Sequence, residues 1–336
     1  MNSLPTVGFC MLETVKGDFL PQDLWDRFQQ LPLRILEIEP ELSWQSDPEF
    51  FLRERPRLLI TGWGAPPLPE RREEMPGLEY VCHLAGSVRG LIPRALLEQG
   101  LQVSNWGTAH AATVAECALM LALCCLRRVV ESNRVMHVDR QWMWPNQCRP
   151  LSLYRRRVGM HGIGAVARAL VPLLHPFDCE VAAYSVDVPP EVFEAAGVKR
   201  LDTLEELFAW SEVLIECEAA SPQNHCTVRE EHFRLLPEDA VFVNVGRAAV
   251  VDEAGMVRVA QEGCIQFGLD VYHSEPLPEA SPLRGLWNVT LLGHQAGPTL
   301  DRRRDCGEIA LENVERSLRG ESPLNLIGLE MYDRAT

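Results

Sequence analysis

The sequence predicts an α/β protein with two doubly wound parallel sheets. Short apolar runs of strand length alternate with runs at helical spacing along most of the 336 residues. Strands that alternate with helices form parallel sheets covered on both faces. A chain of this length can also bury two separate cores. We therefore expect two domains of the same class.

The first alternation covers residues 6–105. The sequence predicts strands at Val7–Leu12, Arg57–Thr61 and Glu79–Leu84, and helices at Leu20–Leu31, Asp47–Arg55 and up to about Gly100. Ligands bind in crevices outside the carboxyl ends of parallel strands. The loops that contain Trp63 and the turn Gly86–Arg89 are therefore candidate ligand-binding segments. Trp63 is equally consistent with a packing aromatic residue.

A second alternation begins after an apolar run at Ala111–Val130, which we expect to be a buried helix that connects the domains. Residues 139–153 are rich in Trp, Pro and Arg and predict a loop. The later strands are expected at Val181–Tyr184, Val213–Cys217, Ala240–Val245, Ile265–Val271 and Val289–Leu292. The later helices are expected at Leu204–Trp210, Arg229–Leu236, Glu253–Glu262 and Asp301–Arg319, the last returning to the first domain.

Between the two alternations, residues 157–187 predict a strand, a glycine turn, a helix at Ala165–Leu174 and a second strand. Gly162 permits the tight turn, Gly164 has no side chain to hold a phosphate away, and the small Ala167 lets the helix pack on the strand. The helix N-terminus offers free N–H groups to an anion. This unit therefore predicts a dinucleotide site, with Gly162, Ile163, Gly164, Ala165 and Val166 as candidate cofactor-binding residues.

Composition excludes several partners and sites. The formal charge of −15 argues against nucleic acid and anionic membranes, which are bound mainly by clustered Lys and Arg. Eleven scattered cysteines, no His and Cys spacing of a metal site and no leader at Met1 predict reduced thiols, no metal and a cytoplasmic location.

Three ionisable residues, Arg247, Glu275 and His294, each follow a predicted strand. Such positions share the sheet edge at which the glycine turn lies. Arg247 offers a planar fork of donors for a substrate carboxylate. His294 can give a proton to an oxygen that becomes an alkoxide and take it back, and Glu275 favours the imidazolium and orients the ring. Each residue alone is more often structural or solvated; together they indicate a catalytic site.

These residues belong to a longer series of motifs. In the order and spacing of these motifs, the sequence resembles the NAD(P)-dependent D-2-hydroxyacid dehydrogenases, which include phosphoglycerate dehydrogenase and the glyoxylate/hydroxypyruvate reductases. The resemblance covers nearly the whole chain. The motifs are Gly86–Val88, Thr113–Glu116, Gly162–Gly164, Asn244–Asp252, Leu269–Val271, Glu275–Pro276, His294, Glu312–Val314 and Gly320–Ile327.

The resemblance implies that Arg247, Glu275 and His294 are the catalytic residues. It implies that the backbone around Ser87 and Val88 binds the substrate carboxylate, with Trp63 and Arg89 nearby. Asp270 and the Val245 carbonyl would hold the nicotinamide amide, and the loop Glu218–Pro222, with Ala219 and Pro222, would pass under the adenine. A Rossmann domain, residues 108–297, would be inserted into a flavodoxin-like substrate domain, residues 1–107 and 298–336. Members are usually dimers built through the helix that matches Thr113–Arg128.

The sequence departs from the family pattern at two places. Ser185 stands where an acidic residue usually follows the second strand, and Asp187 lies two positions on. Both are candidate cofactor-binding residues. No Lys or Arg follows before Lys199, which favours NAD(H) without excluding NADP(H). Arg89 stands at a usual Asp or Asn position, where it could serve as a second substrate-binding cation.

The sequence therefore predicts a dimeric oxidoreductase that transfers hydride between NAD(P)H and a small anionic 2-oxo or 2-hydroxy acid. The glyoxylate/hydroxypyruvate reductases are one model for its activity. The alternative is a non-catalytic, NAD(H)-sensing dimeric binding protein of the same fold.

Overall fold

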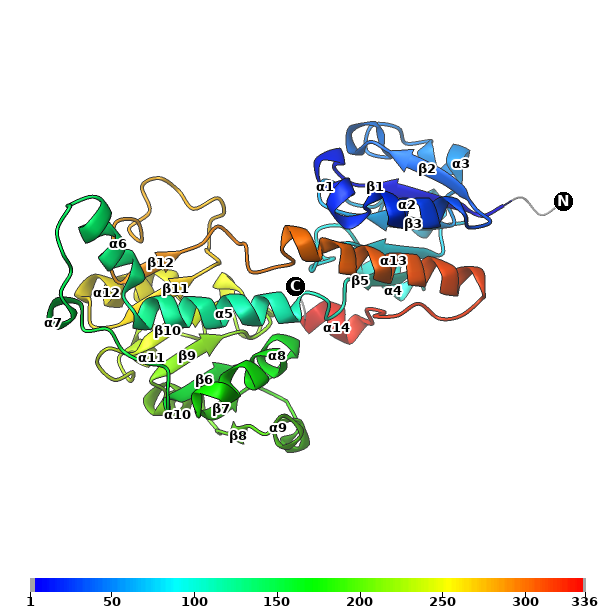
Figure 1. Cartoon of the computed structure of the whole chain (residues 1–336). Helices are drawn as coiled ribbons and strands as arrows, with labels where there is room; N and C mark the ends of the chain where they lie inside the picture. The colour runs from blue at the N-terminus through cyan, green and yellow to red at the C-terminus, as the bar shows by residue number, and fades with distance from the viewer. Residues whose placement is uncertain (1–3, 335–336) are drawn as a thin grey trace. The chain divides into compact units, whose positions relative to one another are not determined.

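The computed structural model describes residues 4–334 and divides the chain into two compact units. One unit contains Met1–His110 and Pro298–Thr336, and the other contains Ala111–Gly297. Figure 1 labels the elements of both units. Each unit contains one parallel sheet, as the sequence predicts.

The first unit has a five-stranded sheet with the order β2-β1-β3-β4-β5. This order is that of flavodoxin-like sheets, as expected. Its strands are β1 Thr6–Cys10, β2 Arg34–Ile38, β3 Leu58–Thr61, β4 Tyr80–His83 and β5 Gln102–Asn105. The two outer strands, β2 and β5, are absent from the sequence-based prediction.

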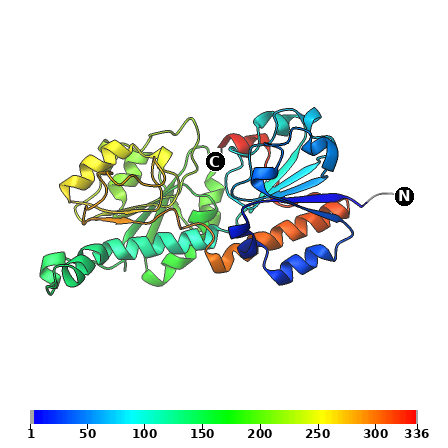
Figure 2. The ribbon, with the colours of Figure 1, turned by 90° about the horizontal axis from the view of Figure 1, so that it is seen from above.

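Side chains alternate between the two faces of this sheet because strand residues have a period of two. Val7 and Phe9 pack on one side with helices α1 (Glu13–Phe19), α2 (Gln22–Gln29) and α13 (Arg303–Leu318). Leu59 and Val81 pack on the other side with helices α3, α4 and α14. In Figure 2 the orange α13 and the red α14 lie on opposite sides of this sheet. Helices α3, α4 and α14 span Phe50–Glu54, Arg94–Glu98 and Leu329–Arg334.

The second unit has a seven-stranded sheet with the order β12-β11-β10-β9-β6-β7-β8. Counted from β6 as the first strand, the order is 3-2-1-4-5-6-7, which is the Rossmann order with one added strand. The chain therefore reverses direction across the sheet between β6 and β9. The strands are β6 Arg157–His161, β7 Glu180–Tyr184, β8 Lys199–Arg200, β9 Val213–Glu216, β10 Val241–Asn244, β11 Gln266–Leu269 and β12 Val289–Leu291.

Two apolar cores cover the faces of this sheet. One core joins β6 and β9 to α5 (Ala111–Leu126), α8 (Ala165–Leu174) and α9 (Pro190–Ala196). The other joins β9, β10 and β11 to α10 (Leu204–Trp210), α11 (Glu230–Phe233) and α12 (Glu253–Glu262). Helices therefore cover both faces and leave the carboxyl edge of the sheet to the loops.

The expected helix over Ala111–Val130 is too long. Helix α5 ends at Leu126, and a separate helix, α6, spans Val129–His137. Arg128 breaks the helix with a left-handed backbone (φ 53°), and its guanidinium contacts Asp239 at 2.6 Å. Val129 and Val130 are exposed rather than buried. A short helix, α7 (Pro145–Cys148), lies inside the expected loop 139–153.

Candidate active site

The glycine turn follows β6, at the point where the strand order reverses. Gly162 has φ +99°, and a Cβ there would lie 2.9 Å from the backbone of Glu218. At Gly164 a Cβ would meet nothing within 4 Å. Gly164 is the N-cap of α8 and provides no side-chain cap, so the first N–H groups of the helix are available to an anion. The turn therefore fits a pyrophosphate, with Ile163, Ala165 and Val166 beside it.

An imidazole–carboxylate pair lies at the same sheet edge. His294 Nδ1 and Glu275 Oε2 are 2.6 Å apart. Their side chains are 49% and 34% exposed, so both reach the surface of the second unit. The other Glu275 oxygen accepts the Tyr272 N–H at 2.9 Å. Glu275 is thereby fixed in orientation, and it fixes the ring of His294 in turn.

Asp270 anchors the loop that carries His294. Its carbonyl oxygen accepts the His294 N–H at 2.9 Å. Its carboxylate accepts the Gln295 N–H at 2.7 Å and the Ala296 N–H at 3.0 Å. Asp270 is 1% exposed, and His294 has a left-handed backbone (φ 54°). The buried carboxylate therefore holds a turn in which a side chain after β12 points away from the core.

Arg247 follows β10, the neighbour of β11. Its Nη1 donates to the Gly246 carbonyl at 2.9 Å. Burial lowers the pKa of its guanidinium, and the negative charge of Glu275 partly offsets this effect. A guanidinium remains charged near neutral pH even so. Arg247 and Glu275 are thus close enough to interact, and the three predicted catalytic residues follow the adjacent strands β10, β11 and β12.

The loop after β9 is fixed by one side chain. Asn224 Nδ2 donates to the Ala219 carbonyl at 2.7 Å, and its Oδ1 accepts the Ser221 N–H at 2.7 Å. Ala219 and Pro222 are exposed. On the next strand, the Val245 N–H donates to Glu216 O at 3.1 Å. The predicted adenine loop and the predicted nicotinamide contact therefore follow neighbouring strands of the sheet.

A second imidazole–carboxylate pair, His161 and Glu216, lies next to the glycine turn. His161 Nδ1 lies 2.6 Å from Glu216 Oε2, and the two side chains are 3% and 0% exposed. Burial lowers the pKa of His161, but the charge and hydrogen bond of Glu216 and the charge of Glu218 outweigh it, so the pKa is raised. The partners are 55 positions apart, and only the pairing of β6 with β9 reveals them.

The predicted substrate-binding residues lie in the first unit. Trp63 is 36% exposed and packs edge-on against Phe19, with ring centroids 5.4 Å apart, so it has a packing role as well as an exposed edge. Ser87 is exposed and Val88 is buried. Arg89 Nε donates to the Tyr332 carbonyl at 2.9 Å, and its Nη2 donates to the Asp333 carbonyl. In this structure Arg89 therefore holds the end of α14.

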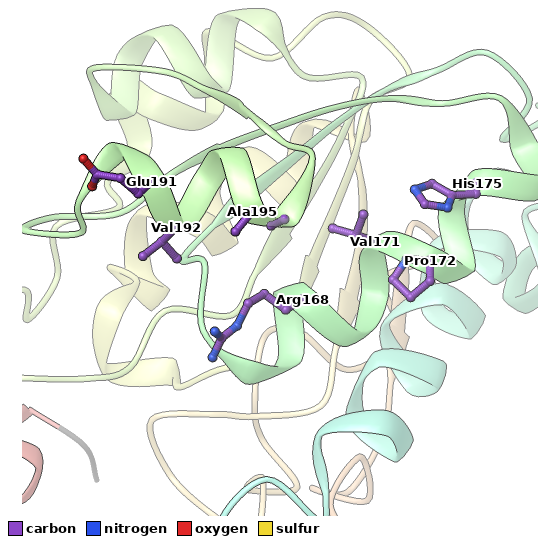
Figure 3. A pocket seen from close by; sticks show the side chains of 8 residues that line it. Arg168, Val171, Pro172, His175, Glu191, Val192 and Ala195 are labelled. Atoms are coloured by element: carbon purple, nitrogen blue, oxygen red, sulfur yellow. The ribbon is translucent and has the colours of Figure 1, made fainter.

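A hollow of about 530 Å³ lies between α8 and α9 (Figure 3). None of its lining residues belongs to the glycine turn or to the three catalytic candidates. We therefore treat it as a surface feature of the α8 flank. The lining residues are Arg168, Val171, Pro172, His175, Glu191, Val192, Ala195 and Ala196.

Residues 4–334 contain no group of three or more His, Cys, Asp or Glu side chains that could hold a metal ion. Over the same residues, no helix has the length and apolar character needed to cross a membrane.

A Rossmann sheet whose glycine turn fits a dinucleotide, with an acid–imidazole pair on the same edge, defines a nicotinamide-dependent oxidoreductase. Residues 119–296 match the family model of the D-isomer specific 2-hydroxyacid dehydrogenase NAD binding domain. Because the match covers more than half of the chain, the protein belongs to the D-isomer specific 2-hydroxyacid dehydrogenase family. This match confirms the resemblance, the class of enzyme and NAD as the class of cofactor.

Individual relatives agree with this assignment. The chain is 28% identical over 265 residues to a glyoxylate reductase of Korarchaeum cryptofilum, covering 77% of this chain and 79% of that protein. It is 26% identical over 259 residues to a D-3-phosphoglycerate dehydrogenase of Methanocaldococcus jannaschii, covering 76% of this chain but only 49% of the relative. The apo structure of Rhodotorula graminis D-mandelate dehydrogenase has the same fold, with a TM-score of 0.81, 22% identity and coverage of 96% and 97%.

Proposed function

We propose that the protein is a D-2-hydroxyacid dehydrogenase that interconverts a small 2-oxo acid and its 2-hydroxy acid, with glyoxylate and hydroxypyruvate as the first substrates to test. The contact between His294 and Glu275 carries this proposal. It supplies an oriented proton donor at the sheet edge that carries the glycine turn. When bound, the nicotinamide cofactor supplies or accepts the hydride at the substrate carbon.

His294 is the proposed proton donor and acceptor. Glu275 occupies Nδ1 of the ring, so Nε2 is the nitrogen left for the substrate oxygen. As the carbonyl carbon gains a hydride, its oxygen becomes an alkoxide, and the imidazolium donates the proton from Nε2. Glu275 orients the ring and receives no proton itself. In the reverse direction the neutral ring removes the hydroxyl proton.

Arg247 of the second unit is the proposed anchor of the substrate carboxylate. A planar guanidinium matches a carboxylate with two parallel hydrogen bonds. In the first unit, the backbone of Ser87 and Val88 and the side chain of Trp63 are proposed substrate contacts. In the second unit, the glycine turn is the proposed cofactor site. Asp270 and the Val245 carbonyl are the proposed nicotinamide contacts. For Arg89 to contact the substrate as predicted, it would have to leave the carbonyls of α14.

A spectrophotometric screen tests the proposal. NADH and NADPH oxidation is followed with glyoxylate, hydroxypyruvate, pyruvate and longer 2-oxo acids, with the His294→Ala variant as the control. We expect oxidation that depends on the 2-oxo acid and on His294. If NADH binds tightly but no acid in the panel is reduced, the protein is instead the non-catalytic NAD(H)-binding alternative.

We also propose that the protein is a cytoplasmic homodimer. The α5–α6 region and the segment after it present several exposed apolar side chains, which are suited to burial against a second copy. A reducing compartment would keep the eleven cysteines as free thiols. Light scattering after size-exclusion chromatography should give twice the chain mass, and Trp142→Glu should lower it. The exposed apolar side chains of the proposed dimer surface are Met120, Val129, Val130, Met136, Val138, Trp142 and Trp144.

A further inference from the structure

A hydrogen bond links the two loops on either side of the glycine turn. Ser185 Oγ donates to Glu218 Oε2 at 2.6 Å. Ser185 follows β7 and Glu218 follows β9, while β6 lies between these strands. A Cβ on Gly162 would meet the Glu218 backbone at 2.9 Å. The Glu218 side chain therefore reaches from β9, past the turn after β6, to the end of β7.

Hydrogen bonds from the core of the sheet hold the Glu218 segment in place. The Glu218 N–H donates to Glu216 Oε1 at 2.9 Å, and the other oxygen of Glu216 contacts the buried His161. Glu218 Oε1 accepts the Ala219 N–H at 3.0 Å. A series of hydrogen bonds thus runs from the core of the sheet to Glu218, which remains partly exposed.

The surroundings of Ser185 are acidic. Residues 186–198 contain Asp187, Glu191 and Glu194 and no Lys or Arg. Burial raises the pKa of Tyr184, and the charges of Glu205, Glu218 and Asp187 raise it further. Arg168, the cation of α8, lines the hollow that faces α9 (Figure 3), and its Nε donates to the Gly164 carbonyl at 3.3 Å.

We propose that Glu218, positioned by Ser185, supplies the carboxylate that binds the adenosine ribose and selects NAD(H) against NADP(H). In Rossmann sheets this carboxylate normally follows the second strand, where this chain has Ser185. Here it comes from the loop after β9 instead. It accepts hydrogen bonds from the ribose hydroxyls, and its charge repels a 2′-phosphate. This inference depends on the proposed function in one respect, namely that the cofactor is a nicotinamide dinucleotide.

The test measures binding without any substrate. Isothermal titration calorimetry gives the Kd values of NADH and NADPH for the wild-type protein and for Glu218→Gln, which keeps the shape and removes the charge. Asp187→Asn tests the other carboxylate near the ribose position. Glu191→Gln on α9 is a matched control for loss of one negative charge. Circular dichroism verifies that each variant is folded.

We expect the wild type to bind NADH at least about tenfold more tightly than NADPH, since a like charge a few ångströms away strongly disfavours a phosphate dianion. Glu218→Gln should lower the ratio of the NADPH Kd to the NADH Kd by roughly tenfold, mainly because NADPH binds more tightly. Asp187→Asn and Glu191→Gln should leave this ratio of Kd values nearly unchanged.

A wild type without NADH preference, an unchanged ratio in Glu218→Gln, or an equal effect of Asp187→Asn would overturn the proposal. Failure of the proposed function looks different. In that case no 2-oxo acid is reduced, while the cofactor preference and its loss in Glu218→Gln are still observed.

Discussion

His294 and Glu275 form a fixed pair in which Nδ1 of the ring lies 2.6 Å from Oε2 of the carboxylate. The second oxygen of Glu275 is held by the Tyr272 N–H, and the His294 N–H is held by Asp270. Both members of the pair are thus oriented by backbone contacts. The ring can exchange a proton through Nε2 without losing its orientation.

His294→Ala should lower kcat by roughly 10²–10⁴, because a positioned acid–base group contributes that much to proton transfer. NADH binding should be retained, since the glycine turn is untouched. Stopped-flow turnover together with cofactor titration separates the two effects. Unchanged turnover in this variant would remove His294 from the proton-transfer role.

Arg247→Lys should lower kcat/KM by roughly 10–100-fold. An ammonium cannot reproduce two parallel hydrogen bonds, each worth about 1.5–3 kcal/mol. Arg258→Lys is the matched control, since Arg258 lies exposed on α12 and contacts Glu230. Steady-state kinetics with the best 2-oxo acid measures both variants. Equal kinetics for the two would show that the fork geometry of Arg247 is not used.

Gly162→Ala and Gly164→Ala should fail in different ways. At Gly162 the positive φ and the contact with the Glu218 backbone strain the folded chain, so the melting temperature should fall. At Gly164 the added methyl group has open space, so the fold should be retained and cofactor binding alone should weaken. Thermal melts and NADH titrations measure both quantities. Normal NADH affinity in Gly164→Ala would place the pyrophosphate elsewhere.

Glu216→Gln should destabilise the second unit, by roughly 3–5 kcal/mol, because it leaves a buried His161 without its charged partner. The pKa of His161 is raised in the folded protein. The stabilisation from this pair is therefore complete below the unfolded-state pKa of about 6.5 and is lost as pH rises through the folded-state value. Melting temperatures across this range should show the gap between wild type and variant narrowing as pH increases. A gap that is constant or widens with pH would contradict an ionised pair.

The strands and helices with strong apolar patterns could be predicted from the sequence. Helix α8 has the expected bounds, Ala165–Leu174, and α10 and α12 also match. The edge strand β2, Arg34–Ile38, is mostly half-buried or exposed, so its pattern resembles a loop. Just beyond the end of α5, Arg128 has a left-handed backbone and contacts Asp239. A partner 111 positions away leaves no local signal.

The same limit applies to the site. Arg247, Glu275 and His294 could be found because each follows a strand and residue type restricts its chemistry. The acceptor of the Ser185 hydroxyl could not be found, because it depends on the side-chain direction of Glu218, which the strand order alone does not give. Likewise, an arginine at a usual Asp or Asn position suggests a cation for the substrate. In the structure, however, the Arg89 guanidinium donates to the carbonyls of Tyr332 and Asp333.

The core of the first unit combines Phe28 of α2 with Leu311 and Val314 of α13. In the sequence, Phe28 precedes the inserted Ala111–Gly297 unit, whereas Leu311 and Val314 follow it. During synthesis on the ribosome, the inserted unit is complete before α13 has been translated. It can therefore fold while one face of the N-terminal sheet is still uncovered. The apolar face of the nascent N-terminal sheet therefore stays exposed until the inserted unit and α13 have been translated, and exposed apolar surface of this kind favours aggregation.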